Sequence, residues 1–67
     1  MLSARNQLKG TIKSVKLGTI MAEVVLTVGK VEVVSVITRD SVERMKLKAG
    51  DTAAAVIKAT AVMILKD

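Results

Sequence analysis

Residues 8–17 and 20–28 alternate apolar and polar side chains with the period of two that is typical of half-buried β-strands. The phase of the first run changes after Ile12, so that Val15 rather than Ser14 is the next apolar position. An extra residue in one strand of a pair produces such a change, and we therefore expect a β-bulge near Ser14. The pattern predicts a β-rich fold.

The third run, residues 31–37, is apolar on both of its faces. Val33 and Ile37 lie on one face, and Val34 and Val36 lie on the other. A strand with two apolar faces is usually buried on both sides. This run therefore predicts either a closed barrel with a partner on its outer surface or a strand that lies between subunits.

One helix and two further strands are expected after the third run. Asp40 and Glu43 have the spacing of a capping box, and Ala49-Gly50 is a suitable helix end. Residues 52–58 and 61–66 predict a fourth and a fifth strand. This order of elements predicts an all-β protein with one short helix, an OB-like five-stranded barrel. A split sheet that is closed only by a second subunit is the alternative.

Length and composition favour an oligomer. The chain has 67 residues without a linker or a repeat, and we expect one domain that spans residues 1–67. A domain of this size buries only about 60% of its unfolded surface, so disulfides, a metal or other subunits usually support it. The chain has no Cys and no His, which removes disulfides and the common zinc ligands. Since hydrophobic residues make up 51% of the chain, association with other copies is expected.

The same absences exclude several classes of function. Without Cys or His the common nucleophile–base pairs cannot be built, so the chain is not expected to be an enzyme. No apolar run approaches the roughly 20 residues of a membrane span. The N-terminus does not look like a signal peptide, because Met1-Leu2 leads directly into polar residues. A cytoplasmic location without membrane attachment is therefore expected.

The charge of the chain favours anionic partners. Eleven Lys and Arg against six acidic residues give a net charge of +5. Nucleic acid is not the expected partner, because the chain has no Phe, Tyr or Trp. Single-strand binders of the OB type depend on aromatic stacking, which contributes about 1–3 kcal/mol per base. A small anion fits this composition better than a polyanion does.

The chain has many side chains that can donate hydrogen bonds to an anion. Arg5 carries a planar group of five donors that is suited to oxyanions. Ser3, Thr38 and Thr60 carry hydroxyls, and Lys58 places an ammonium at the end of an apolar strand. Each also has an ordinary structural explanation, such as a surface charge for Arg5, a solvated strand end for Lys58 and a contact at the helix start for Thr38. None of these residues is a specific signal by itself.

Two longer segments are more informative. Near its N-terminus the chain reads Ser3-Ala4-Arg5-Asn6-Gln7-Leu8-Lys9-Gly10, and near its C-terminus it reads Ala55-Val56-Ile57-Lys58-Ala59-Thr60-Ala61-Val62-Met63-Ile64. Both segments resemble the molbindin or Mop family, small molybdate-binding proteins of the TOBE domain type. In that family the two segments meet across a subunit interface and hold a molybdate or tungstate ion. The oxyanion-binding residues that the resemblance implies are Ser3, Ala4, Arg5, Lys58, Ala59 and Thr60. Thr38 occupies the place of a threonine that ends the third strand in related regulator domains.

The resemblance also implies an assembly and a role. The family forms a hexamer, a trimer of dimers, and the expected role is non-catalytic storage of molybdenum within the cell. Neither a cofactor nor a bound metal ion is expected, because molybdenum is bound only as its oxyanion. The alternative is an OB-like module that binds nucleic acid or a protein partner. A third possibility is a ligand-sensing piece that acts in trans with a transporter or regulator.

Overall fold

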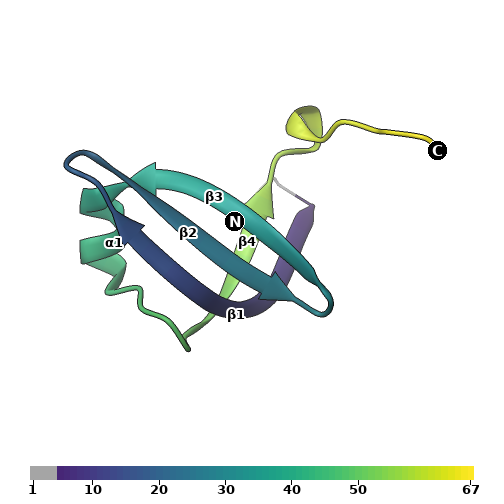
Figure 1. The fold of residues 1–67 in the computed structure, drawn as a ribbon. Helices are drawn as coiled ribbons and strands as arrows, with labels where there is room; N and C mark the ends of the chain where they lie inside the picture. The colour runs from purple at the N-terminus through teal and green to yellow at the C-terminus, as the bar shows by residue number, and fades with distance from the viewer. Residues whose placement is uncertain (1–4) are drawn as a thin grey trace.

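The computed structural model describes residues 5–67. It consists mainly of β-strands with one short α-helix, as expected from the sequence (Figure 1). The elements in chain order are β1 (Asn6–Leu17), β2 (Met21–Val28), β3 (Val31–Thr38), α1 (Arg39–Met45), β4 (Thr52–Ile57) and a short 3-10 helix, η1 (Ala59–Ala61). Within the described residues no helix has the length and apolar content that are needed to span a membrane.

The four strands form one antiparallel sheet in the order β3-β2-β1-β4. One of its two inner strands, β1, pairs with β4 along residues 6–11 and with β2 along residues 11–17. This change of partner within one long strand is accompanied by the strong curvature of the sheet in Figure 1. The expected OB-like arrangement is confirmed, with β3 and β4 as the two edges of an open barrel.

A bulge and a glycine allow β1 to bend at this point. The register with β2 shifts between Ile12 and Ser14, which confirms the bulge expected near Ser14. Just before it, a Cβ atom at Gly10 would stand 2.1 Å from the carbonyl oxygen of Thr27. A side chain cannot occupy that space, so the close approach of the two strands requires glycine. The bend therefore depends on a residue type as well as on the hydrophobic pattern.

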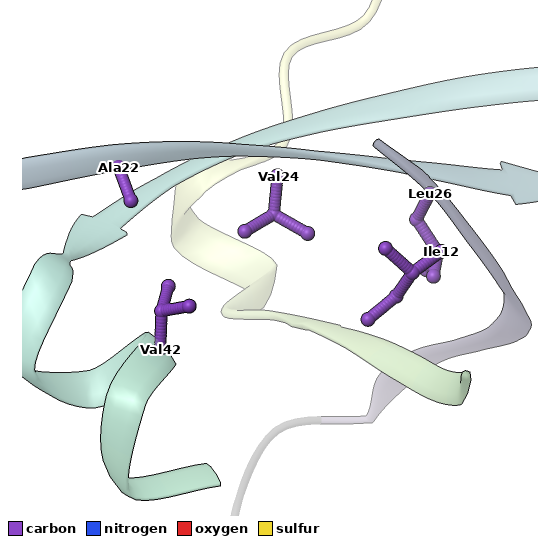
Figure 2. Close-up of a cluster of buried hydrophobic side chains, with 5 residues drawn as sticks. All are labelled: Ile12, Ala22, Val24, Leu26 and Val42. Carbon is purple, nitrogen blue, oxygen red and sulfur yellow. The ribbon is translucent and has the colours of Figure 1, made fainter. Parts of the chain in front are cut away.

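The core lies on the concave face of the sheet. Five side chains are buried there, namely Ile12, Ala22, Val24, Leu26 and Val42 (Figure 2). The first four come from β1 and β2, and Val42 is the residue that α1 contributes to the cluster. The helix thus closes one end of the open barrel, whereas no element of residues 5–67 covers the side between β3 and β4.

The helix begins two residues earlier than the capping-box pattern predicts. Thr38 is its N-cap, and its Oγ1 accepts a hydrogen bond from the backbone N–H of Ser41 (3.1 Å). The prediction that Asp40 caps the helix is wrong, because β3 stays extended through Thr38 and runs directly into α1. Asp40 instead lies in the first turn and forms an ion pair with Arg44, with 3.1 Å between Oδ2 and Nε.

The helix also ends earlier than expected. It stops at Met45, and Lys46 adopts the left-handed conformation (φ 55°) that ends many helices. Ala49-Gly50, which was expected to end it, belongs to the connection to β4, where Gly50 has a φ of 96°.

The fifth strand expected at residues 61–66 is not present in the single chain. Residues 62–67 form no strand, and the side chains of Met63, Ile64 and Leu65 are 92%, 90% and 91% exposed. An apolar sequence becomes a strand only where a neighbouring strand supplies backbone hydrogen bonds. Nothing within the described part of this chain does so for residues 62–67.

Candidate functional site

Arg5 and Lys58 lie at the same end of the β1–β4 ladder. The last residue pair of that ladder is Asn6 with Ile57, so Arg5 and Lys58 occupy the next position on each strand. Both residues are exposed. Two cationic side chains that are far apart in sequence are therefore neighbours in the structure.

The loop before β4 and the packing of β4 fix this register. The backbone N–H of Ile12 donates to the carbonyl of Asp51, and that of Gly50 donates to the carbonyl of Ile12, both at 2.8 Å. Along β4, Ala53 and Ala55 pack against the core. A slip by one residue would turn these alanines outward and would separate the two cations. The alignment of the candidate site is therefore fixed by buried contacts some distance from it.

No ion pair of the described residues compensates the two charges at this end of the sheet. Within residues 5–67 the ion pairs join Lys13 to Glu32, Arg39 to Glu43 and Arg44 to Asp40, and none includes Arg5 or Lys58. Like charges at facing positions on neighbouring strands repel each other. An anion between the two side chains would convert this repulsion into two attractive contacts.

The remaining residues of the C-terminal segment lie in the turn that follows β4. Lys58 is extended (φ −63°, ψ 137°) and precedes η1, which contains Ala59 and Thr60. The backbone N–H of Ala61 donates to the carbonyl of Lys58 at 2.9 Å. The side chains of this turn are exposed. The structure therefore brings Arg5, Lys58, Ala59 and Thr60 to one end of the sheet, whereas Ser3 and Ala4 lie outside the described residues.

Thr38 is not part of this group within one chain. It pairs with Met21 at the start of β2, and this end of β2 lies beside the C-terminal end of β1, at Leu17. Arg5 precedes the opposite end of β1. The Oγ1 atom of Thr38 also donates a hydrogen bond to Oγ of Ser41 (2.8 Å), in addition to its capping bond. A site that combines Thr38 with Arg5 requires Thr38 from another subunit.

A hollow with a volume of about 540 Å³ lies beside the start of α1. Its lining includes Arg39 and Arg44, but each of these is already paired with an acid, Glu43 at 3.7 Å and Asp40 at 3.1 Å. The hollow is therefore electrostatically balanced. In the described part of the chain no three acidic side chains are close enough to hold a metal ion.

An apolar groove of about 450 Å³ lies on the open side of the barrel. It lies between β3 and β4 and is lined mainly by aliphatic side chains, among them Val33, Ile37, Leu47 and Ala55. It offers no charge to an anion. The two apolar faces of residues 31–37 were the sequence signal for this groove, although the sequence did not place β4 on its other side.

Known proteins share both the sequence and this fold. The sequence model of the TOBE domain matches residues 2–64. Molybdenum-pterin-binding protein 3 of Clostridium pasteurianum is 52% identical over 65 residues, which cover 96% of each chain. The structure of a molybdate-binding protein from Sporomusa ovata superposes with a TM-score of 0.95 at 41% identity, over 98% of each chain. The cytoplasmic molybdate-binding protein ModG, solved with molybdate bound, gives a TM-score of 0.84 at 45% identity, over 88% of this chain and 43% of the ModG chain.

These relatives agree with the family that the two terminal segments resemble. The family model covers almost the whole chain, and the relatives are similar both in sequence and in structure. The chain therefore belongs to the TOBE domain family.

Proposed function

We propose that this protein binds molybdate reversibly and without catalysis, at the end of the β1–β4 ladder. The observation that carries this proposal is the alignment of Arg5 and Lys58 at neighbouring, exposed positions without an ion pair in the described residues. Relatives that are named for molybdate or molybdenum binding support the choice of ligand. The proposed binding residues are Ser3, Ala4, Arg5, Lys58, Ala59 and Thr60, with Thr38 supplied by a neighbouring subunit.

The chemistry of this residue set suits a fully deprotonated oxyanion. Molybdate at neutral pH is a tetrahedral dianion that only accepts hydrogen bonds. Arg5 and Lys58 supply charged donors, Ser3 and Thr60 supply hydroxyls, and none of the proposed residues is a carboxylate. Hydrogen phosphate carries a proton that would find no carboxylate acceptor among these residues, and a proton left without a partner in a desolvated site costs about 1–3 kcal/mol. Tungstate has the charge and shape of molybdate and is expected to bind as well.

The proposal includes an assembly of identical subunits, a hexamer built as a trimer of dimers. Val31, Val34 and Val36 on the edge strand β3 are about 60% exposed in the single chain (61%, 60% and 61%). The groove between β3 and β4 and the exposed residues 62–65 add to this apolar surface. A domain this small has few other means of covering such an area. Contacts between copies would cover it and would bring Thr38 of one subunit towards the cations of another.

The proposed role is the storage of molybdenum as its oxyanion in the cytoplasm. ModG, which shares the fold, is described as a cytoplasmic molybdate-binding protein. A store requires reversible binding and no reaction, and the proposed residues include neither Cys nor His, on which the common nucleophile–base pairs depend. Storage therefore agrees with the chemistry of the site.

Isothermal titration calorimetry with sodium molybdate tests the site. Arg5→Ala and Lys58→Ala each remove one charge-assisted donor, which contributes about 1.5–3 kcal/mol, and each should weaken binding about 10- to 150-fold. Lys16→Ala is the matched control, because Lys16 is an exposed lysine near the other end of β1. Unchanged affinity in both site variants would show that molybdate binds elsewhere.

A further inference from the structure

Met63 lies in the C-terminal segment that follows η1, residues 62–67. Its side chain is 92% exposed, compared with 58% for Met45 and 44% for Met21, the other two methionines of the described residues. We propose that Met63 is a site of reversible oxidation by hydrogen peroxide, and that the resulting sulfoxide keeps the subunits from associating. This inference rests on the assembly part of the proposed function and does not involve the oxyanion site.

The composition of the chain directs oxidation to methionine. The sequence contains four Met and no Cys, so no thiol of this chain competes for the oxidant. It also contains no His, Trp or Tyr. A thioether carries no proton, and its reactivity therefore depends on the access of the oxidant to the sulfur and not on a pKa. Of the described methionines, Met63 has the most accessible side chain and is expected to react first.

The reaction transfers one oxygen atom to the Sδ atom of Met63. A lone pair of the sulfur attacks one oxygen of hydrogen peroxide, the O–O bond breaks and an S–O bond forms. The sulfur loses two electrons, and the other peroxide oxygen leaves as water with both protons. The product is a neutral and polar sulfoxide. Methionine sulfoxide reductases return it to the thioether with two electrons and two protons that are supplied by thiols.

The surroundings of Met63 give this change of polarity a consequence. Its neighbours Ile64 and Leu65 are 90% and 91% exposed, and Figure 1 shows the segment running away from the body of the sheet. The groove between β3 and β4 is lined mainly by aliphatic side chains and by no charged residue. Contact between this segment and the groove of a second copy removes apolar surface from water. A sulfoxide oxygen that enters such a contact needs a hydrogen-bond donor, and aliphatic side chains supply none.

Association and oxidation therefore oppose each other. An assembled subunit covers its C-terminal segment and shields the sulfur of Met63, whereas a free subunit exposes it. Oxidation thus marks free subunits and keeps them apart until a reductase restores the thioether. A buried polar acceptor without a partner weakens an association by about 5- to 150-fold, which is the effect expected for the sulfoxide.

A pair of variants isolates Met63 from the other methionines. The double variant Met21→Leu/Met45→Leu retains Met63, and the triple variant adds Met63→Leu as the matched control. Met45 has to be replaced because it lines the groove itself. Met1 is present in both variants, so its oxidation cancels in the comparison. Both proteins are oxidised with hydrogen peroxide in urea and refolded. Intact mass spectrometry then counts the added oxygen atoms, and circular dichroism verifies the fold.

Sedimentation equilibrium over a dilution series measures the protein concentration at half-dissociation. Interference optics are required, because the chain has no Phe, Tyr or Trp for absorbance detection. Oxidation should raise this concentration about 5- to 150-fold in the double variant and leave it unchanged in the triple variant. Methionine sulfoxide reductases A and B should restore the original value. If dilution does not dissociate the proteins, subunit exchange with a ¹⁵N-labelled copy is followed by native mass spectrometry, and oxidation should accelerate it in the double variant alone.

The outcomes separate this inference from the proposed function. If the oxidised double variant associates as before, or if oxidation weakens the triple variant equally, the role of Met63 is refuted, while molybdate binding in calorimetry is unaffected. If peptide mapping of dilute wild-type protein after brief exposure to peroxide shows that Met21 reacts as fast as Met63, the argument from exposure is refuted. If neither variant associates before oxidation, the assembly part of the proposed function is wrong and this inference fails with it.

Discussion

The close approach of β1 and β2 at Gly10 makes a quantitative prediction about stability. A Cβ atom at this position would lie 2.1 Å from the carbonyl oxygen of Thr27 and 2.9 Å from Cγ2 of Val28. Side-chain carbons essentially never approach closer than 3.0 Å, so Gly10→Ala requires the strands to separate locally by the difference between 3.0 and 2.1 Å, which is 0.9 Å. The blocking atom belongs to the backbone, and no change of rotamer relieves the contact.

We expect Gly10→Ala to reduce the free energy of unfolding by about 3 kcal/mol, the upper end of the usual range for overpacked sites. The matched control is Gly29→Ala in the β2–β3 turn. A Cβ atom there meets nothing within 4 Å, and only the positive φ of 59° opposes alanine. The control should therefore lose only about 1 kcal/mol.

Urea denaturation followed by circular dichroism measures the free energy of unfolding of both variants. All samples are kept at one protein concentration, because the unfolding of an oligomer depends on the protein concentration. Hydrogen exchange provides a local readout. In Gly10→Ala the amides of β1 and β2 near Thr11 and Thr27 should exchange faster, whereas in Gly29→Ala they should not. If the two variants lose equal stability, the steric argument for Gly10 is refuted.

Further predictions concern the helix cap, the apolar end of the chain and the ligand. Thr38→Ala removes the N-cap and should cost about 1 kcal/mol of stability in thermal unfolding, whereas Ser41→Ala, which keeps the backbone donor, should cost less. Ile64→Asp should shift the assembly towards smaller species in sedimentation velocity, whereas Lys66→Asp, which also adds an acid to this segment, should have a smaller effect. In equilibrium dialysis tungstate should displace molybdate nearly evenly and phosphate poorly; strong displacement by phosphate would contradict a site without a carboxylate acceptor. Molybdate affinity should also fall as salt increases, because the chain is cationic.

Local sequence patterns were sufficient for much of the fold. The alternation of residues 8–17 and 20–28 predicted β1 and β2, and the change of phase near Ser14 predicted the bulge. These predictions succeeded because the period of an amphipathic strand depends on which residues face the core, and the sequence records that directly. The candidate site was also indicated by sequence, through two segments that resemble a known family and not through any single residue.

The tertiary structure decided which of these segments meet. Only the β1–β4 register places Arg5 beside Lys58 and leaves Thr38 at the other end of the sheet. The helix cap likewise depended on how far β3 stayed extended, since both Thr38 and Asp40 are suitable capping residues. Residues 61–66 show the limit of the pattern most clearly. Their composition is that of a strand, but a strand also requires a neighbouring backbone, and residues 5–67 of the single chain provide none. The sequence by itself therefore indicated β1 to β4 and the residue types at the candidate site, whereas register and pairing, which depend on contacts between distant residues, were decided only by the tertiary structure.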